Sequence, residues 1–139
     1  MSLSHHSLVA WQRADDLFIR LHQLSLKAFP AHERYELGSQ IRRAAYSVAA
    51  NIAEGSARRY RRARLHFFNI SESSLAEVDY CVHVAQRLGY ITDHLADELV
   101  QDIKRVSAPL TGLVRAARTW VIGEAAAGCL LVCALFWLR

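Results

Sequence analysis

LGSQIRRAAYSVAANIAEGS, residues 37–56, is the stretch from which the fold of this chain can be read. Its apolar residues recur at steps of three and four, which places them on one face of a helix; they are Leu37, Ile41, Ala44 or Ala45, Val48 and Ile52. Five small residues in the same stretch let neighbouring helices approach closely: Ala44, Ala45, Ala49, Ala50 and Ala53. Gly55 and Ser56 offer a C-terminal stop. We therefore expect an amphipathic helix that ends near Gly55.

Three further apolar stripes at helical spacing surround this segment. The first extends from about Leu8 to Phe29, before Pro30, through Ala10, Ala14, Leu17, Leu21, Leu24 and Ala28. The second ends at Gly89-Tyr90 and consists of Leu65, Phe68, Leu75, Val78, Val82, Ala85 and Leu88. The third follows a cap at Thr92 or Asp93 and consists of Leu95, Leu99, Ile103, Val106, Leu110, Leu113 and Ala117. Pro109 lies inside the third stripe, where it predicts a bend and not a break.

Four amphipathic helices with short connections predict an all-α, up-down antiparallel four-helix bundle over residues 1–119. The length of 139 residues suits one domain, and 6 Gly and 2 Pro argue against a turn-rich β fold. Three cysteines, Cys81, Cys129 and Cys133, show neither an even number nor metal-ligand spacing. With no signal-like segment at the start of the sequence, we expect a cytoplasmic protein.

A run of arginines follows directly after the first stretch. Five arginines fall within the seven residues 58–64, without an intervening acid: Arg58, Arg59, Arg61, Arg62 and Arg64. The chain has 17 Lys+Arg and 13 Asp+Glu, so without these five the balance is 12 against 13. Guanidinium groups are permanently charged and offer paired donors to phosphate, so the run predicts a nucleic-acid contact. The alternative is a solvated turn that serves solubility.

Helical geometry would disperse these arginines over more than one face, because Arg59 points away from the pair Arg58 and Arg62. A turn or a helix start would gather them at one end of the bundle. Arg42 and Arg43 lie on the preceding helix and extend this surface only if a neighbouring subunit brings them near. The nearby aromatic residues could either stack on bases or pack within the bundle. Phe68 has the spacing of a core residue, while both interpretations stay open for Tyr60 and Phe67.

Polar residues beside the apolar stripes predict a structural network. We expect Asn51 and Glu54 to bond with side chains on neighbouring turns and so to fix the register of the helices; the expected members are Gln40, Asn51, Glu54, Ser73 and Ser74. The alternative, a catalytic or metal-binding role for Glu54, lacks a matched second carboxylate or histidine.

No pattern for catalysis is present in the sequence. The seven histidines contain no pair at i and i+4, no Gly-x-Ser-x-Gly elbow occurs, and no Gly-rich loop precedes Lys-Ser or Lys-Thr. We therefore predict a protein that is not an enzyme and that has no metal or cofactor.

Residues 120–139 form an apolar extension. The fourteen residues from Ala125 to Leu138 carry no charge, but as a helix they reach only about 21 Å, short of the roughly 30 Å of a hydrocarbon core. A helix that starts at Trp120 would be long enough to span the membrane, yet it would include Glu124, whose insertion into the hydrocarbon core is costly. Three interpretations stay open: a helical tail that packs on the bundle or in an oligomer, a membrane anchor, and a non-native extension of the reading frame.

Four segments together carry a resemblance: SQIRRAA (39–45), SVAANIAEG (47–55), SSLAE (73–77) and LGY (88–90). In them the chain resembles the four-helix-bundle family of 23S ribosomal RNA intervening sequence proteins, which is similar to the accessory variability proteins of diversity-generating retroelements. One departure is Ala49, where the family often has proline. The resemblance implies a homo-oligomer, typically a pentamer, with suspected nucleic-acid binding and no established catalysis. Relatives in the retroelement branch assist a reverse transcriptase and its RNA template.

We therefore expect a non-enzymatic, oligomeric bundle that binds RNA or DNA through Arg58, Arg59, Arg61, Arg62 and Arg64, supported by Arg42 and Arg43. Two alternatives stay open. One is a scaffold whose basic patch meets an acidic partner protein, and the other is a tail-anchored membrane protein.

Overall fold

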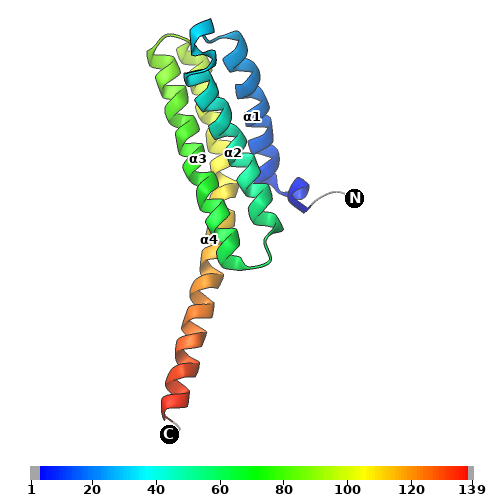
Figure 1. Cartoon of the computed structure of the whole chain (residues 1–139), viewed down its shortest axis with the longest axis vertical. Helices are drawn as coiled ribbons and strands as arrows, with labels where there is room; N and C mark the ends of the chain where they lie inside the picture. The colour runs from blue at the N-terminus through cyan, green and yellow to red at the C-terminus, as the bar shows by residue number, and fades with distance from the viewer. Residues whose placement is uncertain (1–3, 138–139) are drawn as a thin grey trace.

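The computed structural model describes residues 4–137 of the chain, and it describes side chains over residues 5–119. Within this range the protein consists of helices: η1 (Ser4–Ser7), α1 (Val9–Lys27), η2 (Ala31–Arg34), α2 (Leu37–Ala57), α3 (Arg61–Arg87) and α4 (Asp93–Trp137). The four α-helices alternate in direction and lie side by side (Figure 1). The predicted all-α four-helix bundle is confirmed.

The helix ends follow from local sequence signals. Gly89 follows α3 with φ of 74°, a left-handed conformation that glycine adopts without steric cost. The amide of Tyr90 donates to the carbonyl of Ala85, and that of Gly89 to Gln86, each at 2.9 Å, so a Schellman motif closes α3. The next helix starts with a side-chain cap, because the amide of Leu95 donates to Thr92 Oγ1 at 3.2 Å.

The core is a single apolar layer along the bundle axis to which all four α-helices contribute. Its largest fully buried aliphatic side chains are Leu21, Ile41, Val48, Ile52, Val78, Val82, Leu99, Val106 and Leu110. Two predicted stripes need a correction at their ends. Leu88, the C-cap of α3, is exposed, and at the end of α1 Ala28 is exposed while Ser25 is buried instead. Ser25 tolerates burial because its hydroxyl donates to the carbonyl of His22 at 3.0 Å.

α2 and α3 approach each other closely at Gly55. A Cβ atom added to Gly55 would lie 2.6 Å from Cε1 of Phe68, whose ring is buried. One helical turn along α3, the buried hydroxyl of Ser71 donates to the carbonyl of Val48 at 2.8 Å. Gly55 therefore provides the space in which the Phe68 ring packs on α2.

Pro109 lies inside α4 without ending it, which excludes a break at this position. The helix continues to Trp137, beyond the ends of its neighbours (Figure 1). Among the residues that the structure describes, no helix has both the length and the apolar character for a membrane crossing. The three interpretations of residues 120–139 depend on side chains outside the described part, so they stay predictions.

The end of the bundle at the α1–α2 and α3–α4 connections is tied by Glu33. Its carboxylate accepts a hydrogen bond from the hydroxyl of Tyr90 at 2.8 Å and another from the amide of Leu37 at 3.0 Å. These bonds lower the pKa of Glu33 below its ordinary value, and the Tyr90 bond raises the pKa of that phenol. The two connections are thereby joined by one carboxylate.

We predict that Gly55→Ala lowers the free energy of unfolding by about 1–3 kcal/mol, because the added methyl group must displace the buried Phe68 ring. Urea unfolding followed by circular dichroism measures this change. The matched control is Gly112→Ala in α4, where nothing lies within 4 Å of the added atom. That variant should be more stable by about 0.5–1 kcal/mol, since alanine is the better helix former. Equal effects of the two substitutions would contradict the close packing at Gly55.

We also predict that the Glu33–Tyr90 bond makes stability depend on pH at both extremes. Because the pKa of Glu33 is lowered by folding, its contribution is present above the ordinary value of 4.5 and is lost as pH falls through the folded pKa. Because the pKa of Tyr90 is raised, its contribution is present below 10.0 and is lost as pH rises through the folded pKa.

Tyr90→Phe should therefore lower stability at neutral pH and weaken its dependence on pH below about 4.5 and above about 10. Urea midpoints measured across this range test the effect. Tyr80→Phe is the control, because Tyr80 is an exposed residue of α3 and its hydroxyl forms no hydrogen bond within the described residues. Identical pH profiles for Tyr90→Phe and the unmodified protein would contradict the assignment.

Candidate nucleic-acid interface

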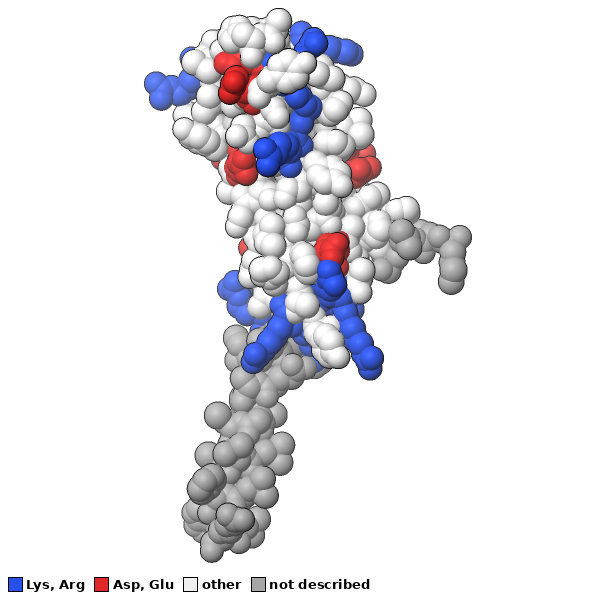
Figure 2. All heavy atoms as spheres, in the orientation of Figure 1, with Lys and Arg blue, Asp and Glu red and all other residues white. Residues whose placement is uncertain are grey.

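The arginine run lies at the turn between α2 and α3. Arg58 directly follows the last residue of α2, Tyr60 is the N-cap of α3, and Arg61, Arg62 and Arg64 belong to its first turn. Lys and Arg side chains gather at this end of the bundle, where they point outward (Figure 2). The arginines thus lie where the sequence analysis expected them, at a turn at one end of the bundle.

Two of the five arginines stabilise the turn itself. Arg58 forms an ion pair with Glu54, and its guanidinium lies 4.8 Å from the centre of the Phe67 ring, a cation–π contact. Arg64 Nε donates to the carbonyl of Arg58 at 2.7 Å, which links the start of α3 to the end of α2. Phe67, which the sequence left open, is therefore the platform for Arg58.

Two others are free for an external partner. Arg59 and Arg62 are exposed, and neither side chain forms an ion pair or a hydrogen bond within the described residues. Both lie with Tyr60 and the half-buried Arg61 around a surface hollow of about 360 Å³. The hollow is thus lined by three arginines and one tyrosine.

The first turn of α3 is electrostatically unfavourable without an anion. It contains no acidic residue, and Tyr60 provides no side-chain cap. The amino end of a helix carries partial positive charge, so each arginine there costs roughly 0.3–1 kcal/mol at low ionic strength. A phosphate group at this end would meet backbone amides and guanidinium groups together.

The structure adds two arginines that the sequence did not connect with this end, Arg115 and Arg118 of α4. Both are exposed and lie around a groove with Glu72 of α3, about 270 Å³ in volume. Thr111 donates to Glu72 at 3.2 Å and so fixes the two helices against each other there. We call the seven residues at this end the arginine collar: Arg58, Arg59, Arg61, Arg62, Arg64, Arg115 and Arg118.

Arg42 and Arg43 do not join the arginine collar, because nearly the whole length of α2 separates them from Arg58. The guanidinium of Arg42 is engaged within the fold, where it donates to Ser25 Oγ at 3.1 Å and to the carbonyl of Arg34 at 2.7 Å. Arg43 is exposed near the start of α2. Arg42 therefore holds α2 against α1 and η2.

The polar network at the α2–α3 interface is smaller than the predicted one. Ser47 Oγ lies 2.8 Å from Ser74 Oγ, and Asn51 Nδ2 donates to Ser47 Oγ at 3.0 Å and to its carbonyl at 2.8 Å. Of the predicted members, only Asn51 and Ser74 belong to this network, and Ser47 links them.

The other three predicted members lie elsewhere. Gln40 is exposed, and its side chain has no hydrogen bond within the described residues. Ser73 points away from α2 and donates to Asn69 in its own helix at 3.1 Å. Glu54 pairs with Arg58. The position of each serine on the helix distinguishes the buried serines from Ser73. Ser71 and Ser74 lie on the same side of α3 as the apolar residues Phe68, Leu75 and Val78.

Two of the four segments that carried the resemblance, residues 47–55 and 73–77, meet at this interface. Residues 6–112 match the family described as 23S rRNA-intervening sequence protein. The chain belongs to this family. It is also similar in fold to a crystal structure of a protein with unknown function from the S23 ribosomal protein family of Bacteroides thetaiotaomicron. The TM-score is 0.72 at 20% identity, over 77% of this chain and 96% of that chain. No curated protein matches closely enough to add to this comparison.

Cys81 and the metal-ligating residue types lie apart from the arginine collar in their chemistry. Burial, with a smaller effect of the Glu77 charge, raises the pKa of Cys81 to about 11, so its thiol stays protonated at neutral pH. Within residues 5–119, no three His, Cys, Asp or Glu side chains are grouped as a metal site would require.

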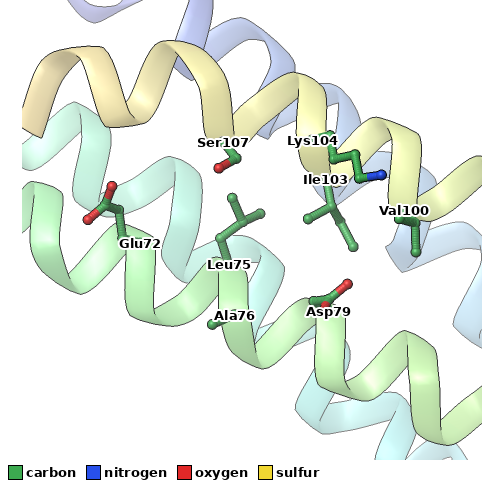
Figure 3. Close-up of a pocket in the computed structure, with 8 residues that line it drawn as sticks. All are labelled: Glu72, Leu75, Ala76, Asp79, Val100, Ile103, Lys104 and Ser107. Atoms are coloured by element: carbon green, nitrogen blue, oxygen red, sulfur yellow. The ribbon is translucent and has the colours of Figure 1, made fainter.

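A groove of about 340 Å³ between α3 and α4 differs in character from the arginine collar. Figure 3 shows Leu75 and Ile103 pointing into it, while Glu72 and Asp79 lie along its α3 side. The basic residue Lys104 also lines this groove. With two carboxylates on one side, this groove repels phosphate and is not an extension of the collar.

Proposed function

We propose that this family member is a non-enzymatic RNA- or DNA-binding bundle whose arginine collar contacts the phosphate backbone. The observation that carries the proposal is the pair Arg59 and Arg62. Both are exposed beside the amino end of α3, and neither has an acidic partner within the described residues. Arg62 lies in the first turn of α3, where the helix dipole disfavours a cation, so a phosphate bound there would relieve a cost that the free protein carries.

The number of available arginines sets the expected strength of the salt dependence. Arg59, Arg62, Arg115 and Arg118 are exposed and unpaired within residues 5–119. Four phosphate contacts would give a slope of about −3.6 in log affinity against log salt on duplex, and about −2.8 on a single strand. Arg58 and Arg64 would contribute less, because their guanidinium groups already bond within the turn.

We further propose that copies of the chain assemble as a homo-oligomer, as the family resemblance implies, and so combine several collars on one particle. Exposed apolar residues on α1 support this proposal. Ile19 and Leu26 lie two turns apart on the same side of α1, and Tyr46 of α2 is also largely exposed. Light scattering on the purified protein gives the mass of the assembly; a monomer at micromolar concentration would contradict it.

The test of nucleic-acid binding is a pair of charge-matched variants. Arg59→Gln with Arg62→Gln removes two charges from the collar and should lower affinity for RNA or DNA by about tenfold, with a salt slope smaller by about two contacts. Fluorescence anisotropy at several salt concentrations measures both quantities. The control, Arg34→Gln with Arg43→Gln, removes the same charge from exposed residues near the start of α2.

The control should retain nearly the full affinity and slope. Equal losses in both variants would show that net charge alone attracts the nucleic acid, and an unchanged collar variant would overturn the proposal. A third outcome is that the protein binds neither RNA nor DNA but does bind an acidic protein. If the collar variant binds that acidic protein more weakly, the collar serves a protein partner.

A further inference from the structure

Tyr60 is exposed at a position where a different residue would stabilise the fold. Its side chain is 74% exposed, and it forms no ring contact or hydrogen bond within the described residues. As the N-cap of α3, it gives no side-chain bond to the helix amides, although Ser, Thr, Asp or Asn there typically adds about 1 kcal/mol. Local stability therefore does not explain the aromatic ring.

Tyr60 differs in this respect from Tyr46, Tyr80 and Tyr90. Tyr35 is also exposed without a side-chain partner within the described residues, but it lies outside the arginine run. The ring of Tyr46 packs against Phe18 with centroids 5.7 Å apart, and Tyr80 stacks on His83 at 6.5 Å. Tyr90 is half-buried and bonded to Glu33. Each of these rings has a partner in the fold, whereas the surroundings of Tyr60 are Arg59, Arg61 and Arg62.

The surroundings of Tyr60 suit a nucleotide with an open base. Tyr60, whose side chain is exposed, lines the hollow of about 360 Å³ together with those three arginines. An aromatic face stacks on any base, and flanking guanidinium groups meet the phosphates on either side of it. In a duplex the base faces are covered by their neighbours, so the ring gains a partner only from an unpaired base.

We propose that Tyr60 stacks on an unpaired base, and that the collar therefore selects single-stranded segments of RNA or DNA, such as loops, bulges and ends. The inference rests on the proposed function, since the arginines must first bring the strand to the turn. Affinity then has two separable parts. The arginines determine its salt dependence, and Tyr60 determines its dependence on bases.

The experiment compares three probes of about 12 units: single-stranded oligothymidylate, an abasic phosphodiester of equal charge, and a blunt duplex. An oligouridylate arm distinguishes RNA from DNA. The unmodified protein should bind the base-bearing single strands at least about fivefold more tightly than the abasic strand, the lower end expected for one stacked base.

Two substitutions at Tyr60 separate stacking from folding. Tyr60→Asn should bind the base-bearing and abasic strands equally, with an unchanged salt slope, while its helix cap keeps or raises the melting temperature. Tyr60→Phe should retain the preference for bases, because the ring remains. Tyr35→Asn is the control, since Tyr35 is 81% exposed and precedes α2 at the opposite end.

The outcomes distinguish the two proposals. If Tyr60→Asn keeps the preference for bases, or if the unmodified protein binds the abasic strand equally well, the stacking role is overturned while phosphate binding stands. If no probe binds the unmodified protein at low salt, the proposed function fails and the role of Tyr60 fails with it.

Discussion

The close contact between α2 and α3 at Gly55 is the constraint on which the rest of this structure depends. Because Gly55 has no side chain, the ring of Phe68 lies against α2, and the Ser71 hydroxyl reaches the carbonyl of Val48 one turn further on. This contact fixes where α3 begins relative to the end of α2. The turn between them contains Arg58, whose guanidinium rests on Phe67, beside Phe68. Core packing and the position of the arginines are therefore one arrangement.

The two ends of the bundle carry different kinds of charge arrangement. Near the η2 end, charged and polar groups face each other inside the fold, as in the bonds of Glu33 with Tyr90 and Leu37. Along the side of the bundle, Arg20 of α1 pairs with Glu98 and Asp102 of α4. At the other end most of the arginine collar faces outward, and the dipole of α3 opposes the charge of the arginines in its first turn. The collar is thus a surface that an external anion would complete.

Helical periodicity predicted the bundle because it is a local property, readable within each segment of the sequence. The polar network was predicted only in part, because it depends on which side of the helix each residue faces. Ser73 and Ser74 are neighbours in sequence, but Ser73 is exposed while Ser74 is buried and lies against Ser47. Arg115 and Arg118 were missed as collar members because only the antiparallel arrangement of α3 and α4 brings them near the turn. Arg42 looked like a surface cation, yet its partners, Ser25 and the Arg34 carbonyl, come from other segments.

Mapping the contact residue by residue tests the central claim, that the collar is the surface that meets nucleic acid. The measurement is the change in backbone amide chemical shifts of the full chain as a single-stranded oligonucleotide is added. If the collar is this surface, the changes are concentrated in residues 56–68 and 111–119, at the end where α2 meets α3. Changes centred on residues 31–43, or along the groove between α3 and α4, would contradict it.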